Sequence, residues 1–285
     1  MLKRVLVIVF ALGLCIAASG QSEGPGLAVH RTFMIQTNLE RGSAFAVDID
    51  NREYWITAKH LFTGIRTGPA GEFKEKQVTA SLLARDADGP PGQDQHWLTQ
   101  TFMVIDPGKD IDILVLAPSK ALFSTAESSI MNPTSEGIMY GGDCEFLGFP
   151  YGGGWKAQGE DNKPLWLPFI KHCAVSGQIT SNGIKVFVLD GIDNEGFSGG
   201  PVLYGTGKDQ RVFAVISASK QEPLEVLPVP VTPNAGQIPT SPTLQGQTPK
   251  QIVNANAGFI VAFDISPAVD AIRKTPIGPA KDQKQ

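Results

Sequence analysis

The chain has 285 residues, of which 42% are hydrophobic, and it carries a net charge of −4. That length suits one two-layer domain of roughly 200–250 residues with appendages, and the acidic balance argues against a basic nucleic-acid-binding surface. The 31 glycines and 21 prolines favour many turns and short strands over long helices.

The first 20 residues have the pattern of a secretory signal peptide. Lys3 and Arg4 precede an apolar run from Val5 to Ala18, and small residues follow it. The alternative is a membrane anchor, but a bilayer-spanning helix needs about 20 apolar residues and this run is shorter than that. We expect cleavage near Gln21, a secreted or periplasmic protein, and no membrane span in the mature chain.

Removal of this segment leaves two cysteines, Cys144 and Cys173. In an oxidising compartment two cysteines can pair, and both lie in strand-like segments of the same half of the chain. The sequence alone leaves open whether they do. No Cys-x-x-Cys pair or histidine cluster accompanies them, so we expect no metal site, and no cofactor is implied.

Alternating apolar and polar residues predict strands throughout the first half of the chain. The predicted strands cover 42–47, 53–57, 77–85, 97–105 and 111–116, with a hairpin turn at 48–52. His60 follows the second of these strands directly, and its simplest role is to cap a buried strand. Asp112 interrupts an apolar strand, where a buried carboxylate needs a cation or an imidazole as partner. The alternative for Asp112 is a strand-end carboxylate that faces water.

A linker over 119–136 separates a second strand-rich half. Its predicted strands cover 142–149, 166–177, 183–189, 211–219 and 258–265, with a loop at 151–164 and a turn at 178–182. Residues 222–250 are rich in Pro, Thr, Gln and Gly and lack apolar periodicity, which predicts a disordered or extended insertion. Pro267 to Lys274 fits a short C-terminal helix with Ser266 as its N-cap.

The stretch Asn194 to Pro201 contains a serine between glycines. Glycine permits backbone conformations that a Cβ forbids, so the amides of Gly196 and Ser198 can point into one small space. Two such donors beside a nucleophile form an oxyanion hole, in which each donor contributes about 3 kcal/mol. The plain alternative is a glycine-rich turn between two strands.

His60, Asp112 and Ser198 together fit one mechanism. A serine nucleophile needs an imidazole to take its proton, and the imidazole needs a buried carboxylate to hold its tautomer. The ordinary pKa of histidine, about 6.5, lets it act as base and then as acid near neutral pH.

Three blocks that contain these residues resemble the signature blocks of trypsin-like (chymotrypsin-fold) serine proteases. The blocks are Thr57–His60, Asp112–Leu116 and Gly196–Pro201. The resemblance extends over about residues 33–202 and two later strands. It implies an all-β fold of two six-stranded antiparallel β-barrels, with the site in the cleft between them and a short C-terminal helix. Together with the residue patterns above, this gives a signal peptide over 1–20, an N-terminal barrel over 21–125, a C-terminal barrel over 126–275 with a Pro-rich insertion at 222–255, and a tail over 276–285.

The resemblance also implies residue roles. Ser198 is then the nucleophile, His60 the general base and acid, and Asp112 the orienting acid, with Asp110 as its competitor. The amides of Gly196 and Ser198 would bind the oxyanion.

Three serine and alanine positions after the nucleophile complete the implied site. Ser217 falls where the family has a serine near the acid, and with Ala218 and Ser219 it is expected to line the substrate channel.

Three departures from the digestive members of the family matter. Leu61 replaces a disulfide cysteine, a pattern that is more similar to bacterial secreted members. Phe197 replaces the aspartate that receives a new N-terminus on zymogen activation, so activation by that route is not expected. Ile192 stands where trypsins have an aspartate for basic side chains, so trypsin-like specificity is not supported.

The implied function is that of a serine endopeptidase that cleaves a polypeptide substrate through an acyl-enzyme. The alternative is a catalytically silent protein of the same fold that binds a partner.

Overall fold

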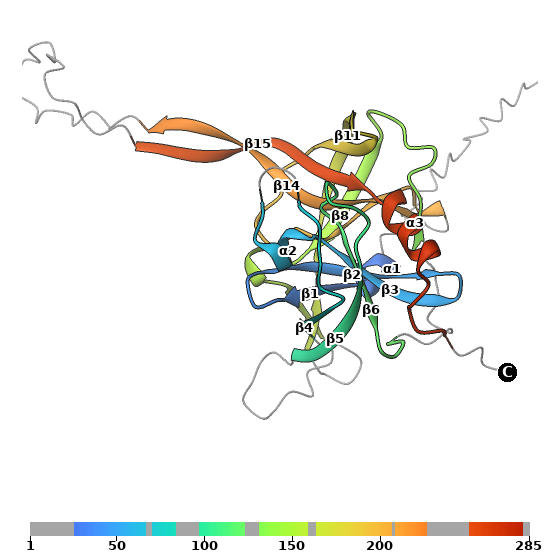
Figure 1. Cartoon of the computed structure of the whole chain (residues 1–285). Coiled ribbons are helices and arrows are strands. Elements are labelled where there is room, and N and C mark those ends of the chain that lie inside the picture. The colour runs from blue at the N-terminus through green and yellow to red at the C-terminus, as the bar shows by residue number, and fades with distance from the viewer. Residues whose placement is uncertain are drawn as a thin grey trace, which may run out of the picture.

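The computed structural model describes residues 26–66, 70–83, 97–122, 131–158, 164–206, 209–226 and 251–281. The predicted signal peptide and most of the Pro-rich insertion therefore lie outside the described residues. Within them the chain is built mainly from β-strands with few short helices (Figure 1), as the sequence predicts. No helix in these ranges is both long enough and apolar enough to cross a bilayer.

The first six long strands form a closed barrel in the order β1-β2-β3-β6-β5-β4. They are β1 (Thr32–Gln36), β2 (Arg41–Ile49), β3 (Arg52–Thr57), β4 (Gln77–Leu83), β5 (Trp97–Ile105) and β6 (Leu114–Pro118). The hairpin between β2 and β3 is tighter than the predicted turn. Asp50 and Asn51 have φ values of 51° and 59°, which matches the two-residue turn that the twist of a hairpin favours.

The position of Asp112 corrects the prediction of a strand over 111–116. β6 begins only at Leu114, so Asp112 lies in the segment that leads into this strand. The turn before it accounts for the difference, because the Asp106 side chain accepts a hydrogen bond from the Gly108 amide and the Ile111 amide donates to the Gly108 carbonyl. Asp112 therefore sits outside the ladder, with its carboxylate available to other partners.

A second antiparallel barrel follows, in the order β13-β8-β11-β12-β15-β14, and the pairing of β13 with β14 closes it. Its strands are β8 (Asp143–Gly148), β11 (Phe169–Ser181), β12 (Ile184–Asp190), β13 (Pro201–Tyr204), β14 (Arg211–Val226) and β15 (Gln251–Asp264), and the short β7 (Asn132–Pro133) adds to β14 in parallel. The two closed six-stranded barrels confirm the predicted fold class.

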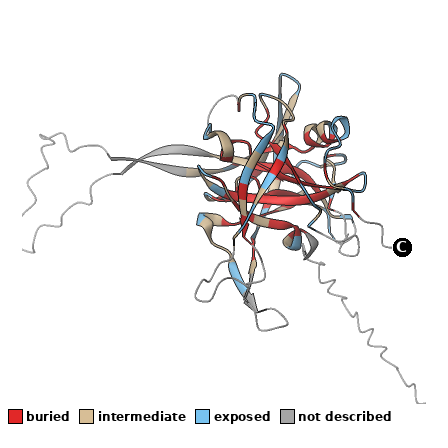
Figure 2. Cartoon of the chain, turned by 60° about the horizontal axis from the view of Figure 1, so that its bottom comes forward, coloured by how far each residue is buried: buried red, intermediate tan, exposed pale blue. Residues whose placement is uncertain are grey.

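Apolar side chains fill both barrels. Figure 2 shows buried residues concentrated in the strands of the molecule's centre, with exposed residues at loops and edges. Phe45 and Tyr54 belong to one large cluster, and Phe146 and Phe213 belong to another. These clusters hold the strand ends in fixed positions, and the candidate site residues follow those ends.

Two predicted loops contain strands instead. The region 151–164 holds a short 3-10 helix, η2 (Pro150–Gly152), and β9 (Trp155–Gln158), which pairs with β10 (Pro164–Leu167). The ends of the predicted insertion at 222–255 belong to β14 and β15, which pair as far as Val226 and Gln251 and project as a ribbon (Figure 1). Backbone pairing requires no apolar periodicity, so the sequence pattern did not reveal these strands. Likewise, β11 extends through the turn predicted at 178–182 and ends at Ser181.

Within the described ranges, three short α-helices complete the structure: α1 (Gly26–Arg31), α2 (His60–Thr63) and α3 (Ser266–Lys274). The sequence predicted α3 but not the other two. The predicted N-cap of α3 was wrong, because the helix begins at Ser266 itself and Ile265 occupies the N-cap position. Asp264 accepts hydrogen bonds from the amide and hydroxyl of Ser266, each at 2.8 Å. After α3 the chain returns to the first barrel, where Lys281 forms an ion pair with Asp48 at 2.6 Å.

Candidate active site

Asp112 and His60 are joined by two hydrogen bonds. The His60 backbone amide donates to Asp112 Oδ1 at 2.8 Å, and His60 Nδ1 lies 2.7 Å from Asp112 Oδ2. Only 2% of His60 and 7% of Asp112 are exposed. An ionised Asp112 accepts the Nδ1 proton, which leaves Nε2 as the lone-pair nitrogen of the neutral ring. These two hydrogen bonds thus set both the orientation and the tautomer of His60.

Ser217 provides Asp112 with a third hydrogen bond. Its hydroxyl donates to Asp112 Oδ2 at 2.5 Å. Three donors compensate the cost of burying this carboxylate. The carboxylate that contacts His60 is that of Asp112, and not that of the competing Asp110.

A buried lysine holds the loops beneath His60. Lys59 is fully buried, and its ammonium group lies 2.6 Å from Asp106 Oδ1. The same ammonium donates to the carbonyl oxygens of Gly71 and Gly108, at 3.1 and 2.7 Å. Because Asp106 and Gly108 belong to the segment that leads to Asp112, this network ties the histidine and its carboxylate to one framework.

The turn that carries Ser198 requires glycine at neighbouring positions. Gly196 and Gly199 have φ values of 104° and 83°, which side chains rarely permit. A Cβ at Gly196 would lie 2.3 Å from the Phe149 carbonyl oxygen, and one at Gly199 would lie 2.1 Å from that of Ser43. The glycines therefore let the turn pack directly on the backbone of both barrels.

Ser43 connects this turn to the first barrel. Its amide donates to the Ser198 carbonyl at 2.8 Å, and its hydroxyl donates to the Gly196 carbonyl at 2.7 Å. The same hydroxyl accepts the Phe149 amide at 3.1 Å. A single residue of β2 thus fixes two carbonyls of the serine turn.

The peptide bond between Glu195 and Gly196 is held in one orientation. The Tyr151 amide donates to the Glu195 carbonyl at 2.6 Å. In a planar trans peptide the N–H points opposite to the C=O, so the Gly196 amide is directed away from Tyr151. In the part of the chain that the structure describes, neither the Gly196 nor the Ser198 amide donates a backbone hydrogen bond outside the strand ladders. Both donors remain available to a ligand.

The hydroxyl of Ser198 is not hydrogen-bonded to His60. Ser198 Oγ donates to the Ser217 carbonyl at 3.3 Å, and His60 Nε2 has no hydrogen-bond partner among the described residues. Both side chains nevertheless line one cavity of about 460 Å³. An apo site often forms this contact only when substrate binds.

The cavity brings together most of the predicted site residues, though not Asp112 or Gly196, and adds others. It is lined by His60, Arg66, Asp193, Asn194, Glu195, Ser198, Ser217, Ala218 and Ser219. Ser217, Ala218 and Ser219, which the resemblance assigns to a substrate channel, line the same cavity as His60 and Ser198.

Asp193, rather than Ile192, supplies a carboxylate to this cavity. Ile192 is 57% exposed, whereas Asp193 is 6% exposed. Burial raises the pKa of the Asp193 carboxyl above its ordinary value, although hydrogen bonds from Ser219 and Asn256 and the nearby Lys171 cation oppose this shift. The sequence analysis assigned no role to Asp193.

An ion-pair cluster links the two barrels at the cavity. Arg66 lies 2.7 Å from Glu40 Oε2 in the first barrel and 3.4 Å from Glu195 Oε1 in the second. The hydrogen bond and charge of Glu40 raise the pKa of the Arg66 guanidinium above its ordinary value, so this cation stays charged. Glu195 directly precedes Gly196, which places a carboxylate beside the candidate oxyanion donors.

Phe197 and the two cysteines lie in the core of the second barrel. Phe197 is fully buried, and its ring packs edge-to-face on Phe146 at 4.9 Å between centroids. No carboxylate is present at this position to receive a new N-terminus. Cys144 and Cys173 are directly opposite on β8 and β11 and form a disulfide, the pairing that the sequence left open.

The described part of the chain contains no group of three or more His, Cys, Asp or Glu side chains suited to a metal ion. Sequence reasoning also missed Ser43, Lys59 and Tyr151, which position the site. The lysine beside His60 was the one available indication, because a charged residue directly after a buried strand needs a partner.

No family model matches the chain, and no curated protein sequence matches it. Solved structures do match. The HtrA-type protease AlgW, solved with a tripeptide, has a TM-score of 0.50 at 14% identity, and the match covers 87% of this chain and 62% of AlgW. The inactive form of Rv3671c from M. tuberculosis H37Rv has a TM-score of 0.49 at 13% identity, with 88% and 89% of the two chains covered. Human heparin binding protein has a TM-score of 0.49 at 14% identity, with 90% and 96% covered.

Proposed function

Because the chain has the fold of the trypsin-like serine proteases, we propose that it is a serine endopeptidase that hydrolyses peptide bonds through an acyl-enzyme. The observation that carries this proposal is the pair of hydrogen bonds between His60 and Asp112. They leave Nε2 without a hydrogen-bond partner among the described residues, and His60 and Ser198 line the same cavity.

In the proposed reaction Ser198 Oγ attacks the carbonyl carbon of the scissile peptide bond, and His60 Nε2 takes the hydroxyl proton. The amides of Gly196 and Ser198 donate to the oxyanion that forms. His60 then gives its proton to the leaving amine, and the C–N bond breaks. Water attacks the acyl-enzyme by the same route and restores the serine. The hydroxyl of Ser198 must rotate away from the Ser217 carbonyl before the first step.

The substrate in this proposal is a polypeptide, and the protein is secreted or periplasmic. The N-terminal pattern of Lys3, Arg4 and the following apolar run supports export. The disulfide between Cys144 and Cys173 fits an oxidising compartment. Leu61, in place of a disulfide cysteine, is in keeping with a bacterial secreted member of the family.

A second candidate function rests on the same serine. Ser198 Oγ donates to the Ser217 carbonyl and not to His60. A protein that keeps this arrangement permanently would be a catalytically silent member of the fold that binds a partner through the cavity.

Labelling with a fluorophosphonate probe separates the two candidates. We expect the wild-type protein to be labelled and Ser198→Ala and His60→Ala to remain unlabelled while both variants stay folded by circular dichroism. Asp112→Asn should slow labelling by about four orders of magnitude, and Asp110→Asn should not. Absence of labelling in folded wild-type protein would favour the silent binding protein.

A further inference from the structure

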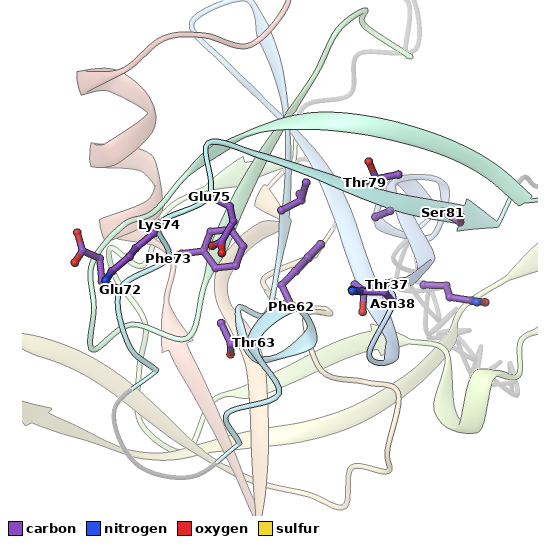
Figure 3. A pocket seen from close by; sticks show the side chains of 13 residues that line it. Thr37, Asn38, Phe62, Thr63, Glu72, Phe73, Lys74, Glu75, Thr79 and Ser81 are labelled. Carbon is purple, nitrogen blue, oxygen red and sulfur yellow. The ribbon is translucent and has the colours of Figure 1, made fainter.

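A second cavity lies on the first barrel, outside the candidate active site. It has a volume of about 740 Å³. Figure 3 shows it between the strand that bears Thr79 and Ser81 and the segment that bears Glu72 and Glu75. The lining residues are Gln36, Thr37, Asn38, Phe62, Thr63, Glu72, Phe73, Lys74, Glu75, Val78, Thr79, Ala80 and Ser81.

One wall of this groove is a strand edge that is only partly paired. β1 pairs with β4 through Ile35 and Gln36 alone, opposite Leu82 and Ser81. β1 then ends, so in the described part of the chain no strand lies beside the β4 edge from Gln77 to Ala80.

The register shows which backbone groups face the groove. The Val104 amide donates to the Lys76 carbonyl, so Lys76 and every second residue after it face β5. Gln77 and Thr79 then direct their N–H and C=O groups outward, in line with Ser81, which pairs with Gln36. An extended chain placed at this edge would continue the line of β1 and meet two donors and two acceptors.

Aromatic side chains supply the apolar part of the groove. The rings of Phe62 and Phe73 meet edge-to-face, with centroids 6.2 Å apart, and both are half-buried. The Phe73 amide donates to Asp106 Oδ2 at 2.7 Å, so the buried network of Lys59 also holds this wall. The groove is therefore preformed and offers a place for an apolar side chain of the added strand.

The charges of the groove favour a basic occupant. Glu72, Lys74 and Glu75 are all exposed on the wall that faces β4, so two carboxylates accompany one ammonium group. The cavity of the candidate active site is likewise lined by two acidic residues, Asp193 and Glu195, and one basic residue, Arg66. The segment from His60 to Arg66 contributes residues to both cavities, so the groove and the site lie against the same segment, although no residue lines both.

We propose that this groove binds an extended, basic segment of the polypeptide substrate as an added strand on the edge of β4. Backbone hydrogen bonds to Gln77 and Thr79 hold the segment, an apolar side chain packs on Phe62 and Phe73, and basic side chains meet Glu72 and Glu75. The assignment of this segment to a substrate rests on the proposed protease function, whereas the binding itself does not.

Fluorescence anisotropy with a fluorescein-labelled peptide of alternating lysine and valine tests the proposal. Ser198→Ala protein is used so that the peptide stays intact. We compare Thr79→Pro, which removes an outward N–H of β4, with Thr101→Pro. Thr79 and Thr101 face each other across β4 and β5, with their hydroxyl oxygens 3.3 Å apart, and Thr101 lies outside the groove.

We expect Thr79→Pro to weaken binding about fivefold, the effect of one lost backbone hydrogen bond, and Thr101→Pro to leave it unchanged. The double variant Glu72→Gln/Glu75→Gln should weaken binding of the lysine peptide and not of a glutamine–valine peptide. Equal effects of the two prolines, or no binding, would overturn the proposal.

Two further measurements distinguish peptide binding in the groove from dimerisation at the same edge and from the proposed protease function. In sedimentation of the free protein, we expect Thr79→Pro to leave the fraction of monomer unchanged. If the protein instead forms a dimer that Thr79→Pro dissociates, the edge of β4 binds a second copy of the chain. Fluorophosphonate labelling of the protein with intact Ser198 tests the protease function alone. Peptide binding without labelling would sustain the groove and refute the proposed function.

Discussion

The ammonium group of Lys59 is buried 2.6 Å from Asp106 Oδ1, immediately beside His60 in the chain. Its other hydrogen bonds reach the carbonyls of Gly71 and Gly108. The Lys59 side chain therefore holds two loops in place: the loop of Gly71, which shapes the groove, and the loop of Asp106 and Gly108, which positions Asp112 beside His60.

Lys59→Met should destabilise the protein by roughly 3 kcal/mol, because it leaves the Asp106 carboxylate partly buried without its cation. Guanidinium unfolding followed by circular dichroism measures the loss. Lys109→Met, an exposed lysine on the same segment, is the matched control and should change the free energy of unfolding little. Similar losses for both variants would show that the ion pair between Lys59 and Asp106 does not contribute to the free energy of unfolding.

Ser217→Ala should slow fluorophosphonate labelling about tenfold without unfolding the protein. The variant removes the hydroxyl that donates to Asp112 Oδ2 at 2.5 Å, and a hydrogen bond to a charged group contributes about 1.5–3 kcal/mol. The carbonyl that accepts the Ser198 hydroxyl belongs to the backbone and remains. Ser176→Ala, at an exposed position of β11, should label at the wild-type rate. An unchanged rate for Ser217→Ala would mean that its hydroxyl does not support Asp112.

Replacing both Cys144 and Cys173 by serine should cost about 3–4 kcal/mol of stability. The bond closes a loop with a sequence separation of 29, and the estimate follows from the entropy that such a loop removes from the unfolded chain. Unfolding of the oxidised wild-type protein against the double variant measures the difference. Reduction of the wild-type protein should reproduce the loss, and reduction of the double variant should have no effect.

Most strands of the fold could be predicted from the sequence, because a strand with one buried face has apolar and polar residues in alternation. β5 occupies the predicted 97–105, since its two ends are set by turn-forming and polar residues. The ribbon at the ends of β14 and β15 left no such trace, because strands held mainly by each other's backbone need no apolar face. The start of β6 was misplaced because Ile111 and Ile113 are apolar and buried without being paired in a ladder.

At the candidate site, side-chain chemistry was predictable and backbone chemistry was not. Asp112 in an apolar segment requires a partner, and the structure supplies His60 and Ser217. The contact of Tyr151 with Glu195 joins two peptide groups, and amide chemistry is the same in every residue, so no residue type marks it. Ser43 is equally unmarked, since a serine in a strand has no particular spacing to a turn far along the chain.

Asp193→Asn should make the protein more stable at neutral pH, and the gain should depend on pH. Burial raises the pKa of the native carboxyl above the value of 3.8 that it has when unfolded. At a pH well below that value the carboxyl is protonated in both states and carries no penalty. As the pH rises from there through the native pKa, the unfolded state releases its proton first, so wild-type stability falls until the native carboxyl is also ionised.

Urea unfolding across this pH range measures the difference between Asp193→Asn and the wild-type protein. It should be small at the acidic end, grow with pH and then level off, because asparagine does not ionise and retains an acceptor for Asn256 and Ser219. Asp190→Asn, at an exposed position of β12, controls for the loss of one surface charge. A difference for Asp193→Asn that stays constant with pH would mean that its burial does not penalise the ionised form.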